Sequence, residues 1–388
     1  MSTAADAPTE ADPERVASAL SAAGFVRVYA RPTGDALAAA GLLARVLRDR
    51  NTPFQVRTTR DGVAPDGDGT ALSLGWDAPN ATGVAPDSRP VSSLAAAVVD
   101  AMGAEPAPLV GLAGVVAAGT VPGDGGSGGM LEEAERRGVV DRRPGVAVPT
   151  ADPADGLAHS TLVRAPFSGD PEAARALLAE VGVPAEPDDD DRRRLASAVA
   201  LDATADAPDR AVGAVERLLR PYATPTGPFE TLGGHADVLD ALARDRPGLG
   251  VSLALGADAA DEAISAWREH AARAHDLLAE PTTGRYDGVF VCRVETDDAS
   301  ASTVSTAARL VRDFASPEPV ALVVSDDAAA AAGDGTVDAT AALRAAVDAA
   351  DGVADGDADV IGDARAGDAR FAGGDVQAFI GAFREALR

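Results

Sequence analysis

The chain has 388 residues, which suggests two or three domains, and it carries 61 acidic against 34 basic residues for a formal net charge of −27. It contains no lysine, and this bias, together with abundant alanine and few aromatic residues, is typical of proteins adapted to molar intracellular salt, as in haloarchaea. Because the Debye length at molar salt is about 3 Å, the negative charge argues neither for nor against nucleic-acid binding.

Targeting and redox signals are few. No apolar run approaches the roughly 18 residues of a membrane span, and the N-terminus has no basic segment followed by an apolar one, which predicts a soluble, cytoplasmic protein. The single cysteine, Cys292, excludes an internal disulfide and a multi-cysteine zinc site. Its apolar neighbours predict a buried position in a strand.

The first part of the chain alternates strands and helices. Residues 1–11 form a polar tail, and Asp12 followed by Pro13 predicts the start of a helix that Gly24 ends. Candidate strands follow at Phe25–Ala30, Gln55–Thr59 and Thr70–Trp76. Strands that alternate with helices predict an α/β fold with a parallel sheet and right-handed crossovers.

The most informative segment is Val26–Asp49. It reads as a strand, a Pro/Gly turn and an amphipathic helix whose apolar face carries Leu37, Ala40, Ala44 and Leu47. A strand that leads through a short loop into a helix is where α/β proteins place phosphate and metal chemistry. Asp35 in this loop is either a residual catalytic residue or a helix N-cap before Ala36.

The run Gly34–Ala40 resembles the first motif of the DHH phosphoesterase superfamily, especially its archaeal RecJ-like exonuclease branch. That motif reads approximately His-x-Asp-x-Asp-Gly-Leu-x-Ala-Ala, and its histidine and two aspartates hold manganese ions. In this chain the three ligand positions fall on Arg31, Thr33 and Asp35, and Arg31 is a candidate for contact with nucleic acid. A two-metal site needs several oxygen or imidazole ligands around ions about 3.5–4 Å apart, which one carboxylate cannot supply.

The later motifs of the family are also incomplete. The second is a strand that ends in aspartate, and here Asp77 reaches that place only after a shift of register. The third, Asp-His-His, meets Asp87–Arg89, which contains no histidine, and the fourth, an aspartate near the end of an apolar helix, meets Ala117 and Ala118. The resemblance therefore implies a degenerate cleft without a metal or other cofactor, and manganese only if the ligands lie elsewhere.

The resemblance also implies two domains. A DHH domain, with its mainly parallel sheet, would cover residues 12–220 and end in a connecting helix within Ala207–Arg220. A smaller α/β DHH-associated domain would cover residues 221–388, after the Pro- and Gly-rich stretch Arg220–Phe229. The acidic run Glu186–Asp191 could bind a metal, but its position before three arginines favours the solvated N-terminus of a helix.

The second half contains a possible nucleic-acid signature. Gly233, Gly234 and His235 resemble the GGH signature with which RecJ-type accessory domains contact the nucleic-acid backbone, although they lie earlier in the chain than that signature does. The alternative is a loop histidine without such a role. A strand is expected to follow at Gly248–Gly256. His270 and His275 lie five positions apart, too far around a helix for a paired ligand site, and are interpreted as surface or packing residues.

The C-terminal part is expected to form a β-α-β unit followed by a terminal helix. The strands are Gly288–Glu295 and Pro319–Ser325, with a helix near Ser302–Phe314 between them. Gly362–Arg370 then occupies the place of the family signature. There Arg365 and Arg370 are candidates for phosphate contact through their guanidinium groups, and the alternative is charge pairing with Asp363 and Asp368.

Three functions remain open, and the first is favoured. It is an inactive RecJ-like protein that binds single-stranded DNA or RNA or acts as a scaffold. Such a protein would be similar to the RecJ-related subunit of the eukaryotic replicative helicase, with GINS and MCM proteins or an active RecJ-like paralogue as partners. The second is an active manganese-dependent 5′-to-3′ single-strand exonuclease. The third is a structural or RNA-linked partner protein without a replication role.

Overall fold

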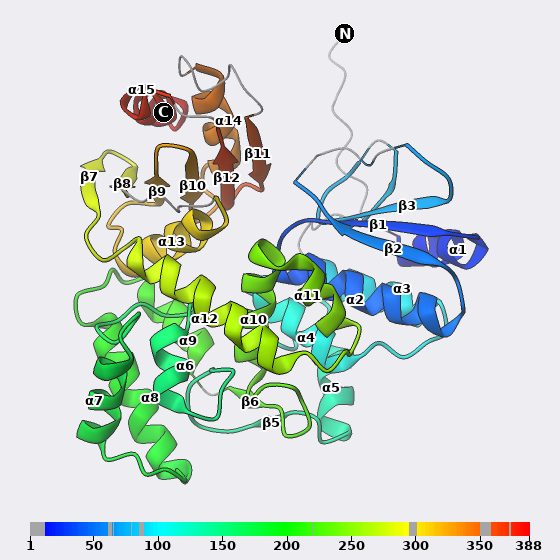
Figure 1. Ribbon diagram of the computed structural model, residues 1–388, viewed down its shortest axis with the longest axis horizontal. Helices are drawn as coiled ribbons and strands as arrows, with labels where there is room; N and C mark the ends of the chain where they lie inside the picture. Colours follow the sequence, from blue (N-terminus) through cyan, green and yellow to red (C-terminus); the bar gives the residue numbers. More distant parts are fainter. Residues whose placement is uncertain are drawn as a thin grey trace. The chain divides into compact units, whose positions relative to one another are not determined.

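The computed structural model describes most of the chain, and Figure 1 shows its course. The described residues are 12–60, 64, 66–78, 80–84, 89–219, 221–294, 301–349, 358–371 and 374–388. The chain forms two compact units, of which unit 1 comprises Met1–Asp141, Thr224–Pro228 and Val238–Ala263. Unit 2 comprises Arg142–Ala223, Phe229–Asp237 and Ile264–Arg388. The chain changes unit several times, including twice within the expected boundary segment at 220–229, and the division into domains at 12–220 and 221–388 stays a prediction.

A four-stranded parallel sheet forms the frame of unit 1, as the sequence predicts. Its strands are β1 (Val26–Ala30), β2 (Phe54–Thr58), β3 (Thr70–Leu74) and β4 (Thr82–Val84). Their order is β2-β1-β3-β4, and all three pairings are parallel. The chain moves from β1 to one side for β2 and to the other side for β3 and β4, so the strand order reverses next to β1. In open parallel sheets the carboxyl end of such a switch point is where ligands bind.

Helices cover unit 1 around one central helix, α2. The helices that lie wholly in this unit are α1 (Pro13–Ala22), α2 (Gly34–Asp49), α3 (Val91–Ala101), α4 (Pro108–Ala117), α5 (Gly128–Arg136) and α11 (Pro247–Ala254). Figure 1 shows α2 and α3 side by side along one face of the sheet. Every residue of Gly34–Ala44 is buried, so α2 is enclosed on all sides over these turns and not only on one face.

Small residues permit this close packing around α2. A Cβ atom on Gly41 would lie 2.5 Å from the Cβ of Ala254, and one on Gly250 would lie 2.4 Å from Leu37. Both contacts come from α11, a helix where a strand was expected at Gly248–Gly256, so that expectation is wrong. A short apolar run does not distinguish a strand from a buried helix, and Pro247 in the first turn favours the helix.

Unit 2 contains a six-stranded mixed sheet with the order β11-β12-β10-β9-β8-β7. The strands are β7 (Thr282–Tyr286), β8 (Val289–Arg293), β9 (Val320–Val324), β10 (Ala328–Ala332), β11 (Asp359–Gly362) and β12 (Ala366–Arg370). Only β8 and β9 pair in parallel, and α13 (Ala301–Phe314) connects them, which confirms the expected β-α-β unit. In Figure 1, α13 lies on one face of this sheet, whereas α14 (Ala339–Ala349) and α15 (Val376–Ala386) lie on the other.

The remaining elements are mostly helices with well-formed ends. They are β5 (Asp141–Arg142), α6 (Pro153–His159), α7 (Pro171–Val181), α8 (Asp189–Thr204), α9 (Ala211–Leu218), β6 (Tyr222–Ala223), α10 (Leu232–Asp245) and α12 (Ala260–Asp276). Asp12, Asp152 and Asp170 each cap a helix that has proline in its first turn, because their carboxylates accept hydrogen bonds from backbone N–H groups. Gly182 ends α7 with φ of 72°, a left-handed conformation that glycine adopts at little cost.

Candidate functional site

The segments aligned with the family motifs lie together at the carboxyl edge of the sheet of unit 1. A Cβ atom on Gly34, in the first motif, would lie 2.9 Å from the Cβ of Ala117, at the position of the fourth. A Cβ atom on Gly75, which follows the second-motif strand, would lie 3.1 Å from the Cγ of Arg31. The fold thus brings these motif positions close together. Whether they can bind metal ions depends on the oxygen and nitrogen donors that they carry.

Asp35 caps a neighbouring helix. Its carboxylate oxygens accept hydrogen bonds from the backbone N–H groups of Val91 at 2.7 Å and Ser92 at 2.8 Å, which are the first residues of α3. That helix has no side-chain cap at its own N-cap position, Pro90. The N-cap of α2 is instead Thr33, whose hydroxyl accepts a hydrogen bond from Ala36 N–H, so the expectation that Asp35 caps its own helix is wrong.

The environment of Asp35 disfavours its charge. Asp35 is 8% exposed, and burial raises the pKa of its carboxyl from 3.8 to about 6, against the hydrogen bonds from Ser92 and Val91. The charge of Asp240 raises it further. Asp240 accepts a hydrogen bond from Gly34 N–H at 3.1 Å and pairs with Arg244 at 2.5 Å. Sequence reasoning missed Asp240, because it lies 206 positions from Gly34 and belongs to no motif.

The donors present at this edge do not fit a pair of manganese ions. Both oxygens of Asp35 are already engaged by α3, and the carboxylate of Asp77 lies against Gly83 of β4. Asp87 and Ser88, from the third motif, lie outside the described residues. In the part of the chain that the structure describes, no group of three or more His, Cys, Asp or Glu side chains could hold a metal ion.

Arg31, predicted to contact nucleic acid, lies where the family motif has its histidine. Its backbone N–H donates to the carbonyl oxygen of Leu74 at 3.0 Å and joins the end of β1 to the end of β3. Its guanidinium carbon lies 6.0 Å from the centre of the Trp76 ring, at the outer limit of a cation–π contact. Arg31 therefore stacks within the edge of the sheet, and its contact with nucleic acid stays a prediction.

Gly233, Gly234 and His235 lie in the first turn of α10 and are buried. A Cβ atom on Gly234 would lie 2.2 Å from the backbone nitrogen of Pro149, and one on Gly233 would lie 2.6 Å from the Cβ of Ala147. His235 is 3% exposed, and its ring meets the ring of Phe229 edge-on at 5.0 Å. The expectation of a loop histidine is wrong, and this geometry gives the three residues a packing role in unit 2 without an exposed surface for a nucleic-acid backbone.

Arg365 and Arg370 lie in the hairpin of β11 and β12 and are exposed. The carboxylate of Asp363 accepts hydrogen bonds from the backbone N–H groups of Arg365 at 2.7 Å and Ala366 at 3.1 Å. Neither guanidinium forms an ion pair with any residue that the structure describes. The alternative of charge pairing with Asp363 and Asp368 is therefore wrong, and both arginines keep their hydrogen-bond donors for another group.

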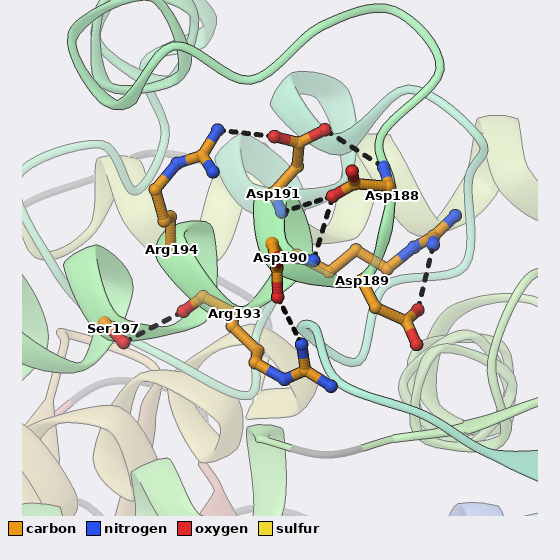
Figure 2. Close-up of polar contacts among 8 residues, drawn as sticks. Asp188, Asp189, Asp190, Asp191, Arg193, Arg194 and Ser197 are labelled. Carbon is orange, nitrogen blue, oxygen red and sulfur yellow. Dashed lines mark hydrogen bonds and ion pairs between the residues drawn. The ribbon is translucent and has the colours of Figure 1, made fainter.

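The acidic run forms the start of α8, as the sequence favours. Asp188 and Asp191 form a capping box in which each side chain accepts from the backbone N–H of the other. Figure 2 shows these contacts together with the ion pairs one turn apart, Asp189 with Arg192, Asp190 with Arg193 and Asp191 with Arg194. The carboxylates thus offset the helix dipole and pair with the arginines that follow.

His270, His275 and Cys292 are packing residues in unit 2, as predicted. His270 Nε2 lies 2.9 Å from the Thr306 hydroxyl, and His275 Nε2 lies 3.1 Å from the carbonyl oxygen of Ser160. Burial lowers the pKa of His275 from 6.5 to about 4 and raises the pKa of the Cys292 thiol to about 12. Cys292 is therefore protonated and unreactive at neutral pH.

Comparison with solved structures shows which proteins share this fold. CDC45 from Entamoeba histolytica superposes with a TM-score of 0.59 at 9% identity, covering 94% of this chain and 95% of that one. RecJ from Thermus thermophilus in complex with Mn²⁺ superposes with a TM-score of 0.50 at 15% identity, covering 99% of this chain and 55% of that one. The chain thus has a fold similar to those of CDC45 and RecJ, with the expected α/β architecture.

Sequence comparison then gives the family. The chain is 47% identical over 336 residues, 85% of its length, to 87% of the uncharacterized protein rrnAC1427 of Haloarcula marismortui. Residues 281–385 match the family described as uncharacterized protein rrnAC1427, C-terminal domain. The chain belongs to the rrnAC1427 family, and the Haloarcula relative agrees with the haloarchaeal composition. Among the described helices, none has the length and apolar character needed to cross a membrane.

Proposed function

We propose that this protein is a catalytically inactive RecJ-like protein that binds single-stranded nucleic acid or serves as a scaffold subunit of a replicative helicase assembly. One observation carries the proposal. Asp35, the one motif carboxylate that remains, is buried, and both of its oxygens accept hydrogen bonds from the backbone N–H groups at the start of α3. The neighbouring motif positions Thr33 and Ala117 supply a helix cap and an apolar contact in place of metal ligands. The likeness of the fold to CDC45 supports the scaffold role.

Nucleic-acid contact is assigned to the hairpin of unit 2. Arg365 and Arg370 are exposed, and their guanidinium groups have no ion-pair partner among the residues that the structure describes. A guanidinium binds a phosphate through two parallel hydrogen bonds, and such short-range contacts are screened less at molar salt than long-range attraction is. Single-stranded DNA or RNA is therefore the ligand that we propose for this hairpin. GINS and MCM proteins, or an active RecJ-like paralogue, are the proposed protein partners.

An assay of hydrolysis separates the inactive protein from an exonuclease. End-labelled single-stranded DNA is incubated with wild-type protein and with the Asp35→Asn variant in molar KCl and Mn²⁺. We expect no turnover by either protein. Mn²⁺-dependent cleavage by the wild type that Asp35→Asn abolishes would overturn the proposal and support the manganese-dependent exonuclease instead.

Affinity purification tests the scaffold role. The tagged full chain is recovered from a haloarchaeal extract at molar KCl, and its partners are identified by mass spectrometry. We expect GINS and MCM proteins or a RecJ-like paralogue. Recovery of ribosomal or tRNA-modifying proteins in their place would contradict the replication role and favour the RNA-linked alternative.

A further inference from the structure

Unit 2 contains a polar cavity that is separate from the motif positions and from the hairpin of β11 and β12. Its volume is about 480 Å³. It lies where the loop before α6, the helix α6, the first turns of α7 and the middle of α12 meet. Its lining consists of Thr150, Ala151, Asp152, Asp155, His159, Pro171, Arg175 and Arg268. Two arginines, a histidine and a threonine hydroxyl thus face one space of the size that small-molecule ligands occupy.

Asp155 orients two of these donor groups. Arg268 Nε and Nη2 donate to its two carboxylate oxygens at 2.9 and 2.8 Å, in a fork-to-fork pair. His159 Nδ1 lies 2.9 Å from the backbone carbonyl oxygen of Asp155 and 3.3 Å from its carboxylate. Burial opposes the ionisation of Asp155, but Arg268 outweighs burial and lowers the pKa of this carboxyl below its ordinary value.

The donors that remain have no partner among the described residues. Arg175 makes no hydrogen bond or ion pair, Arg268 keeps Nη1 free, and His159 uses only Nδ1, which leaves Nε2. The other acidic residue, Asp152, caps α6 through a hydrogen bond from Ala154 N–H at 3.0 Å. Both carboxylates of the lining are therefore engaged by protein groups, whereas donors from the two arginines are not. Because Nδ1 of His159 donates to a carbonyl oxygen, Nε2 of the neutral ring is an acceptor and not a donor.

We propose that this cavity binds the phosphate group of a small phosphate ester, held by the guanidinium groups of Arg175 and Arg268. A phosphate group has three or more acceptor oxygens, and guanidinium groups match it in geometry and charge. The cavity volume exceeds what the anion alone needs and leaves room for an organic group such as a nucleoside. The inference does not depend on the proposed function, because the cleft and the hairpin contribute no residue to this cavity.

Trp267 supplies a direct reporter of binding. Its ring centre lies 5.8 Å from that of His159, and the chain has only two tryptophans, so a Trp76→Phe background leaves Trp267 as the sole one. The protein in molar KCl is titrated with inorganic phosphate, with AMP and with a 5′-phosphorylated oligothymidylate. Tryptophan fluorescence and calorimetry are recorded for each probe.

The matched variants are Arg175→Gln and Arg193→Gln. Arg175 is exposed and unpaired, so its replacement leaves the fold intact, and Arg193 is an exposed arginine of α8 outside the cavity. We expect AMP to bind and Arg175→Gln to raise its dissociation constant about tenfold, while Arg193→Gln changes little.

Equal affinity for inorganic phosphate would assign the site to the free ion, and tighter binding of the oligonucleotide would assign it to a strand end. Failure of all three probes, or binding that Arg175→Gln leaves unchanged, would contradict the proposal.

Discussion

Asp35 in unit 1 is buried and Asp155 in unit 2 is partly buried, and the two carboxylates have different kinds of partner. Asp35 accepts from two backbone N–H groups, and burial raises its pKa to about 6. Asp155 binds the guanidinium of Arg268, which lowers its pKa against the effect of burial. A carboxylate satisfied by the start of a helix is a structural cap, whereas one that orients an arginine leaves the other donors of that arginine available to a ligand.

The same contrast separates motif positions that pack from positions that present side chains. At the carboxyl edge of unit 1 the positions aligned with the DHH motifs hold Thr33, Asp35 and Ala117. These residues cap a helix or pack closely against a neighbour. Gly234 is likewise packed against backbone in unit 2. The arginines of the β11–β12 hairpin and of the cavity keep donors that no described residue binds. Resemblance to a motif therefore indicates architecture here, and we expect ligands at these arginines instead.

The largest expected effect tests the packing role of the GGH segment. In Gly234→Ala the new Cβ atom would overlap the backbone at Pro149, and we expect a loss of about 3 kcal/mol in the free energy of unfolding. Gly213→Ala is the control, because nothing lies within 4 Å of its Cβ position in α9, and alanine should stabilise that helix by about 0.5–1 kcal/mol. Urea melts in molar KCl measure both. A neutral Gly234→Ala would show that the segment is not packed as described.

The next effect tests the capping role of Asp35. Asp35→Ala leaves the N–H groups of Val91 and Ser92 without an acceptor, at an expected cost of about 2–3 kcal/mol in the free energy of unfolding. Asp35→Asn keeps one acceptor oxygen and should lose about half as much. Chemical denaturation at neutral pH gives both values. Wild-type stability in Asp35→Ala would contradict the cap and reopen a catalytic role for this carboxylate.

The pH dependence of the unfolding free energy tests whether burial raises the pKa of Asp35. The folded-state pKa of Asp35 lies above its ordinary value, so its contribution to stability is complete below about pH 4 and is lost as the pH rises through about 6. The free energy of unfolding of wild type minus that of Asp35→Asn should therefore fall by on the order of 2 kcal/mol across this window. A flat difference curve would mean that burial does not perturb Asp35.

His275 should show the opposite slope. Burial depresses its folded-state pKa to about 4, so its contribution is present above its ordinary value of 6.5 and is lost as the pH falls towards 4. The difference in unfolding free energy between wild type and His275→Gln should rise by on the order of 2 kcal/mol from pH 4 to 6.5. A flat difference would place His275 in solvent, and a difference that falls over this window would place it beside an acid.

The smallest expected effect concerns the exposed arginines of the β11–β12 hairpin. Arg365→Gln and Arg370→Gln should each raise the dissociation constant for oligothymidylate about two- to fivefold, because an exposed ionic contact contributes little. The dependence of log K on log salt should flatten by about 0.7 for each phosphate that an arginine no longer binds. Fluorescence anisotropy at several KCl concentrations measures both quantities, with Arg193→Gln as control. Equal binding by all three variants would remove the hairpin from the interface.

Local signals in the sequence were sufficient for much of the fold. The Asp-Pro pair at residues 12–13 predicted a helix start, and strands that alternate with helices predicted the parallel sheet and the β-α-β unit. The site was less accessible, because its contacts join distant parts of the chain. Neither the bond from Gly34 to Asp240 nor the acceptance of Val91 N–H by Asp35 has a local signature. The apolar run of α11 was predicted to be a strand because its apolar residues do not follow a helical period.

Manganese binding shows whether the carboxyl edge of unit 1 still has the donors for a pair of metal ions, which we infer that it lacks. The full chain and its Asp35→Asn variant are titrated with Mn²⁺ in molar KCl and followed by electron paramagnetic resonance. We expect weak binding that is the same in both proteins and comes from the acidic surface. Two tightly bound, spin-coupled manganese ions that disappear in Asp35→Asn would contradict it.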